Sequence, residues 1–76
     1  MNNQQPEAYP VSVRECEIID GHEITLSTIR FTTPALALAY LDGLSEAPRL
    51  FETINRHALY YSQVSGHTFL LTQGVQ

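Results

Sequence analysis

The stretch IDGHEITL at residues 19–26 returns in altered form as VSGHTFLL at residues 64–71. Each copy combines a branched aliphatic residue, a turn-forming polar residue, Gly and His with a following run that is typical of a β-strand. Another strand-like run precedes each copy. The repeat therefore predicts two similar β-hairpins that flank the middle of the chain. With only two copies, it does not indicate a solenoid.

The first hairpin is predicted over residues 10–19 and 22–32, which are rich in Val, Ile, Thr and Phe. A two-residue turn at Asp20-Gly21 would place Glu17 opposite Ile24 and would mix charged and apolar side chains on one face. We therefore expect a three-residue loop, residues 19–21, with its Gly in the left-handed conformation. The same rule predicts a loop at residues 64–66, with Tyr61 opposite Phe69 and Leu59 opposite Leu71.

In both strands of the first hairpin, the apolar side chains change from one face of the strand to the other near its middle. In the first strand Val11 and Val13 point to one face, whereas Cys16 and Ile18 point to the other. Two explanations remain open: each strand carries a bulge, or the hairpin buries different faces at its two ends. The second explanation requires something that covers the extra apolar face.

Two short helices are predicted between the hairpins. Thr33 and Pro34 form a typical helix start, and Gly43 is placed to end this helix. Apolar residues surround the helix almost completely, which predicts burial on more than one side. Ser45 would cap the second helix, and the apolar face of that helix would consist of Leu50, Phe51, Ile54 and Ala58.

The expected architecture is an α+β fold with the order ββααββ. Residues 1–9 are expected to form a disordered N-terminal lead-in, and residues 10–74 a single small domain. The two antiparallel hairpins would flank the two short helices and join in one four-stranded sheet. The strand order stays open, as does the alternative that the hairpins pack as two ribbons. Cys16 is the only cysteine in the 76-residue chain, so no internal disulfide can brace this domain. Small domains without disulfides often gain stability from a partner or from self-association.

Composition narrows the classes of partner. The chain has eight acidic residues against four basic ones, a net charge of −4, and every basic residue is an arginine. This balance argues against nucleic acid and against an anionic membrane surface as partners. No apolar run approaches the roughly 20 residues that span a bilayer, and the N-terminus lacks the features of a secretory signal. We therefore expect a cytoplasmic protein. The residues also give no sign of a small-molecule substrate.

Residue spacing does not indicate an enzyme, a cofactor site or a metal site. The side chains that zinc prefers are present, but no two of them stand at the spacing of a zinc finger; they are His22, His57, His67 and Cys16. We interpret the histidines as residues that open strands at exposed hairpin ends. Cys16 stands at an alternating position within a strand, where a small buried hydrophobe is expected. We predict no catalytic, cofactor-binding or metal-binding residue.

Several features favour a function based on contact. Tyr60 and Tyr61 are adjacent on a predicted strand and must point to opposite faces, so one of them is available to a partner. Glu15 and Glu17 share one strand face, where a solvated acidic patch is expected. The residues predicted to contact a partner are Leu38, Asp42, Tyr60, Tyr61, Glu15 and Glu17.

These features predict a small acidic, non-catalytic interaction protein. It would act as an inhibitor, adaptor or regulator of a protein partner, of the kind that mobile elements encode, or it would cover its apolar surface by forming a homodimer. The main alternative is a structural or assembly subunit of a larger complex, such as a phage particle or a multi-subunit enzyme. A small metal-binding protein is the third alternative.

Overall fold

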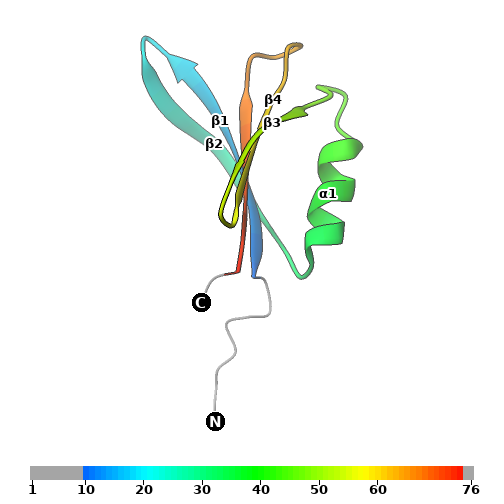
Figure 1. The fold of residues 1–76 in the computed structure, drawn as a ribbon. Helices are drawn as coiled ribbons and strands as arrows, with labels where there is room; N and C mark the ends of the chain where they lie inside the picture. Colours follow the sequence, from blue (N-terminus) through cyan, green and yellow to red (C-terminus); the bar gives the residue numbers. More distant parts are fainter. Residues whose placement is uncertain (1–9, 75–76) are drawn as a thin grey trace.

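A computed structural model describes residues 10–74, so the expectation for residues 1–9 lies outside the described residues. Five strands and one helix follow each other along the described chain: β1 (Val11–Ile19), β2 (His22–Phe31), α1 (Pro34–Asp42), β3 (Arg49–Ile54), β4 (His57–Tyr61) and β5 (Thr68–Gln73). All five strands belong to one antiparallel sheet with the order β2-β1-β5-β4-β3 (Figure 1). The predicted order ββααββ is therefore wrong, because the chain folds as ββαβββ.

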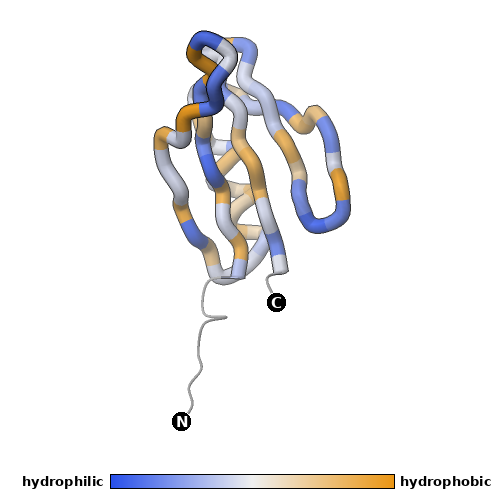
Figure 2. Tube along the Cα trace, turned by 90° about the vertical axis from the view of Figure 1, so that its left-hand side faces the viewer, coloured by the Kyte–Doolittle hydropathy of each residue, from blue (hydrophilic) through white to orange (hydrophobic). Residues whose placement is uncertain are grey.

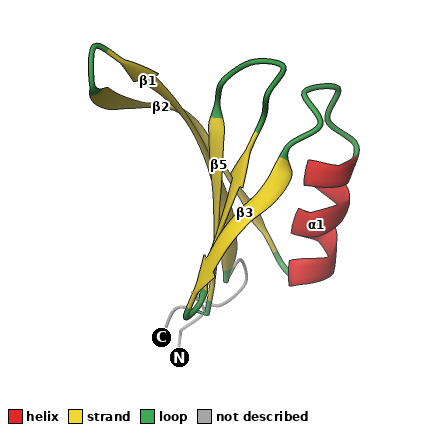
Figure 3. Ribbon diagram, turned by 45° about the horizontal axis from the view of Figure 1, so that its top comes forward, coloured by secondary structure: helices red, strands yellow, loops and turns green. Residues whose placement is uncertain are grey.

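The central strand β5 joins two hairpins into this sheet. It pairs with β1 of the first hairpin on one side and with β4 of the β3–β4 hairpin on the other (Figure 3). Both partners are antiparallel to β5. The second copy of the repeated stretch thus contributes the strand at the centre of the sheet, and the first copy contributes an outer hairpin.

The predicted three-residue loop of the first hairpin is wrong. Asp20 and Gly21 form a two-residue turn with φ angles of 52° and 79°, the positive values that a tight hairpin turn of this kind requires. Glu17 consequently pairs with Ile24, the arrangement that mixes charged and apolar side chains. This mixing is tolerated because the end of the hairpin extends past α1 (Figure 1), where Ile24 stays exposed to water.

A bulge in β2 accounts for part of the slip in alternation. The register of β1 against β2 shifts between Glu15 and Cys16, which leaves Leu26 of β2 as the extra residue. Against β5, the register of β1 is continuous. Val13 and Cys16 therefore point to opposite faces of the sheet, and both are buried, with 2% and 1% of their surface exposed. The burial predicted for Cys16 is confirmed.

The helix begins and ends as predicted. The Thr33 Oγ1 atom accepts a hydrogen bond from the backbone N–H of Leu36 at 3.3 Å, and Gly43 follows the last helical residue. On one side α1 buries Ala37 and Leu41 against the sheet. On the other side, Leu38 is 47% exposed. Among the described residues, the helix is therefore buried on one side and not on two.

The prediction of a second helix is wrong, because the residues at its centre form strand β3. A proline disfavours the right-handed helical region for the residue before it, and Ala47, which precedes Pro48, lies outside that region with a φ of 52°. Asn55, with a φ of 54°, then starts a tight turn that pairs Ile54 with His57. Turn-forming residues at both ends leave only a short segment between them. Its aromatic and β-branched residues favour an extended chain.

The predicted register of the β4–β5 hairpin is also wrong. Tyr61 pairs with Thr68 and Tyr60 with Phe69, one residue away from the predicted pairing. The connection between the strands spans residues 62–67 and not three residues. Tyr60 and Tyr61 point to opposite faces, as predicted, because neighbouring strand residues alternate.

The sheet has two different faces. The helix covers one, where Val11, Val13, Phe69 and Leu71 form the core with Ala37 and Leu41. Alternation places Ile54, His57, Leu59, Tyr61 and Leu70 on the other, which we call the open face. Figure 2 looks onto this face, with α1 behind the strands. Within residues 10–74, no helix has the length and apolar character needed to cross a membrane.

Candidate functional site

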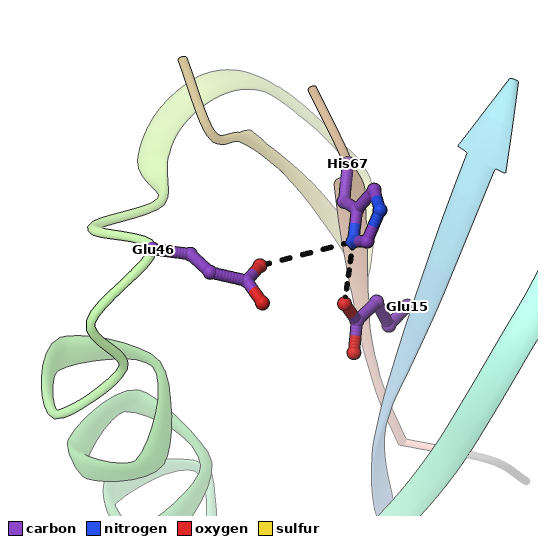
Figure 4. A group of neighbouring side chains, drawn as sticks. All are labelled: Glu15, Glu46 and His67. Atoms are coloured by element: carbon purple, nitrogen blue, oxygen red, sulfur yellow. Dashed lines mark hydrogen bonds and ion pairs between the residues drawn. The ribbon is translucent and has the colours of Figure 1, made fainter. Parts of the chain in front are cut away.

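Three polar side chains from distant parts of the sequence meet near the C-terminal end of α1 (Figure 4). Glu15 lies in β1, Glu46 in the α1–β3 connection and His67 in the β4–β5 connection. The Nδ1 atom of His67 lies 2.7 Å from Glu15 Oε2 and 3.9 Å from Glu46 Oε1. All three side chains are half-buried, with 18–30% of their surface exposed. We call these residues the His67 cluster.

Ser62 organises the loop that carries His67. This residue is fully buried, and its Oγ atom donates a hydrogen bond of 2.6 Å to the carbonyl oxygen of Glu46. The same atom accepts hydrogen bonds of 3.1 Å from the backbone N–H groups of Val64 and Ser65. Ser65 Oγ in turn donates to Glu46 Oε1 at 3.1 Å and accepts from the backbone N–H of His67 at 3.2 Å. The two serines therefore fix Glu46 relative to His67.

The carboxylates raise the pKa of His67 above its ordinary value of 6.5. The hydrogen bond with Glu15 is the main cause, partial burial acts in the opposite direction, and the negative charges of Glu15, Glu46 and Glu17 add to the rise. The pKa of Tyr40 is also raised, first by burial and then by the charges of Glu15 and Glu46. The cluster is thus a region of negative potential.

The stabilisation that His67 provides is expected to depend on pH. Because the folded-state pKa lies above the ordinary value of 6.5, the contribution is full below that value and is lost as the pH rises through the raised pKa. The melting temperatures of wild type and His67→Gln should therefore differ more at about pH 5.5 than at about pH 9. Glu15→Gln, which removes the main cause of the shift, should show the same trend. A difference that grows with rising pH would contradict this assignment.

The sequence interpretation of the histidines holds for two of them. His22 begins β2 and His57 begins β4, and both are exposed. It is wrong for His67, which is half-buried between two carboxylates. The acidic patch predicted at Glu15 and Glu17 is also more specific than expected, because Glu15 is the hydrogen-bond partner of this histidine.

The open face carries a shallow apolar hollow of about 150 Å³, lined by Glu52, Ile54, His57, Leu59 and Leu70. The register aligns two of these residues, Leu59 and Leu70, across β4 and β5. Both leucines are half-buried, whereas Ile54 is 55% exposed. A second hollow of about 260 Å³ lies at the start of β3, at the edge of the sheet, and is lined by Arg49, Leu50, Phe51, Tyr61 and Gln63. Apolar side chains thus remain accessible on this side of the sheet.

Every arginine that lies within a strand points to the open face. The register places Arg14 beside Leu70, Arg49 beside Tyr61 and Arg30 beside Ser12, all on the side away from α1. The acidic residues of the open face are Glu23 and Glu52, and Arg14 Nη2 lies 3.9 Å from Glu23 Oε1. The His67 cluster lies on the helix side. The two sides of the described sheet therefore differ in the sign of their charge.

The residues predicted to contact a partner are scattered. Tyr61 lies on the open face and is 42% exposed, whereas Tyr60 packs against the core on the helix side. Glu15 belongs to the His67 cluster, and Glu17 is close enough to influence His67. Leu38 and Asp42 are exposed on α1. The structure brings Glu15 and Glu17 together near one histidine, but it gathers no common surface from all six residues.

Comparisons of the chain with known proteins found no match. No model of a protein family matches the chain, and neither a curated protein nor a solved structure matches it.

Proposed function

We propose that the protein is a non-catalytic protein-binding module that contacts its partner through the open face. One observation carries this proposal. The helix buries one face of the sheet, whereas the opposite face keeps an apolar hollow among the described residues. Of the large hydrophobic residues that are exposed, Ile18, Ile54 and Tyr61 lie on this face by strand alternation. Exposed apolar surface of this kind typically marks a site of protein contact.

Contact through the face is favoured over contact through an edge. Each edge strand of the sheet carries a bulge, which leaves Leu26 of β2 and Phe51 of β3 as extra residues. Bulges on edge strands hinder the addition of a strand from another chain. A partner would therefore bind against side chains of the open face, and not by extending the sheet.

The charges favour a partner whose surface is apolar and acidic. Arg14, Arg30 and Arg49 project on the same side as the apolar hollow, and guanidinium groups bind carboxylates through two parallel hydrogen bonds. A symmetric homodimer formed by this face would bring together two faces on each of which three arginines outnumber two glutamates. A heterologous acidic protein is thus the better complement. An inhibitor, adaptor or regulator would act in this way.

The test uses two variants with similar exposure. Ile54 is 55% exposed on the open face and Leu38 is 47% exposed on α1, so Ile54→Asp and Leu38→Asp introduce the same charge on opposite sides of the molecule. We expect a protein captured by wild type to be retained by Leu38→Asp and lost by Ile54→Asp. The purified pair should then bind more weakly as salt concentration rises and when Arg49 is changed to Glu.

Three outcomes would overturn the proposal. The first is that Ile54→Asp binds every captured protein as wild type does. The second is that Leu38→Asp alone loses binding. The third is a stable wild-type dimer in size exclusion with light scattering that Ile54→Asp separates into monomers. That result would identify a second copy of the chain as the occupant of the open face.

A further inference from the structure

We propose that the His67 cluster binds a divalent transition-metal ion such as Zn²⁺, with Glu15, Glu46 and His67 as its three protein ligands. Each residue offers one ligand atom, and these atoms all lie within 4.8 Å of one another. The cluster is on the opposite side of the sheet from the open face, so this site stands independently of the proposed protein contact.

The donor set and the distances suit such an ion. Zinc binds imidazole nitrogen and carboxylate oxygen at about 2.0–2.2 Å, so neighbouring ligand atoms in a tetrahedral site lie about 3.4 Å apart. The distances from His67 Nδ1 to Glu15 Oε2 and Glu46 Oε1 are 2.7 Å and 3.9 Å, one shorter and one longer than this value. A small movement of the Glu15 carboxylate away from His67 Nδ1, and of the Glu46 carboxylate toward it, would bring both distances to the tetrahedral value. The fourth position would be left to water.

The balance of charge provides a separate argument. Among residues 10–74, no arginine lies within ion-pairing distance of Glu15 or Glu46, and His67 is their only cationic partner. The two half-buried carboxylates therefore carry two negative charges, whereas one imidazolium supplies a single positive charge. Removing unbalanced charge from water is unfavourable. A divalent cation would neutralise the excess, and the imidazole distinguishes this site from a purely acidic patch.

The framework holds the ligands before any ion arrives. Glu46 Oε1 accepts a hydrogen bond from Ser65 Oγ at 3.1 Å, and the carbonyl oxygen of Glu46 accepts one from the buried Ser62. Hydrogen bonds of this kind orient metal ligands, and their loss weakens metal binding about 10- to 100-fold. The sheet fixes Glu15 independently, because its strand pairs with β5. Partial exposure of all three side chains leaves a path for the ion.

The experiment is calorimetric titration of the untagged full-length chain with Zn²⁺ alone, after treatment with a chelator. We expect one ion per chain, with affinity at least about tenfold lower in Glu46→Gln and in His67→Gln. The matched controls are Glu52→Gln and His57→Gln, whose side chains lie on the open face, and these should bind within about twofold of wild type. Affinity should also fall as pH is lowered, because protons compete for the imidazole.

A second measurement needs no variant and so does not depend on the folding of one. Addition of Co²⁺ to isotopically labelled wild type should broaden the resonances of Glu15, Glu46 and His67 first. Absence of Zn²⁺ binding by wild type would overturn the proposal. An equal loss of affinity in His57→Gln and His67→Gln would overturn it too, as would broadening centred elsewhere. In those cases the cluster is only an ion pair that fixes the β4–β5 loop.

Discussion

Phe69→Ala is expected to lower the free energy of unfolding by about 4 kcal/mol, whereas Leu70→Ala should lower it by no more than about 2 kcal/mol. These adjacent residues of β5 point to opposite faces. Phe69 is fully buried within the core beneath α1, whereas Leu70 is half-buried on the open face. Truncation of Phe69 leaves a cavity that its packed neighbours cannot fill. Truncation of Leu70 removes a side chain that water already reaches.

The pair separates folding from binding. A domain of this size has a total stability of only about 3–10 kcal/mol, so Phe69→Ala should lose a large part of it and unfold at a much lower urea concentration, as followed by circular dichroism. Leu70→Ala should stay folded, and its affinity for an open-face partner should fall at least about tenfold. Equal losses of stability at the two positions would show that the faces of β5 are wrongly assigned.

Local signals in the sequence predicted the first hairpin and the helix. Asp20 and Gly21 mark the first turn, and Thr33, Pro34 and Gly43 mark the ends of the helix, so each boundary depends on residues only a few positions apart. The prediction of the second helix was wrong for a related reason. Its apolar residues have helical spacing, but positive φ angles at Ala47, just before Pro48, and at Asn55 interrupt the chain so close together that only a short strand fits between them.

The candidate sites could not be predicted because they depend on strand pairing. The hydrogen bond between Glu15 and His67 joins residues separated by 52 positions. It exists because β1 pairs with β5 in a register that sets Glu15 opposite Phe69. Local patterns predict both hairpins but no strand order. The helical spacing around Arg49 and Ile54 predicts a helix, so their position on the open face does not follow from the sequence.

The largest effect expected from a single polar side chain is at Ser62. Ser62→Ala should lower the free energy of unfolding by about 2 kcal/mol, because it leaves one carbonyl oxygen and two N–H groups without their partner. Ser27→Ala, at an exposed position of β2, is the control and should change stability by no more than about 0.5 kcal/mol.

Hydrogen exchange distinguishes this mechanism from a general loss of packing. The backbone N–H groups of Val64 and Ser65 donate to Ser62 Oγ in the wild type, so they should exchange faster in Ser62→Ala than the change in global stability requires. The amides of β1 should follow global stability alone. Because Ser62 also holds the carbonyl of Glu46, the variant should loosen the contact between Glu46 and His67. If Val64 and Ser65 instead exchange at rates set by global unfolding, then Ser62 does not organise the loop that presents His67.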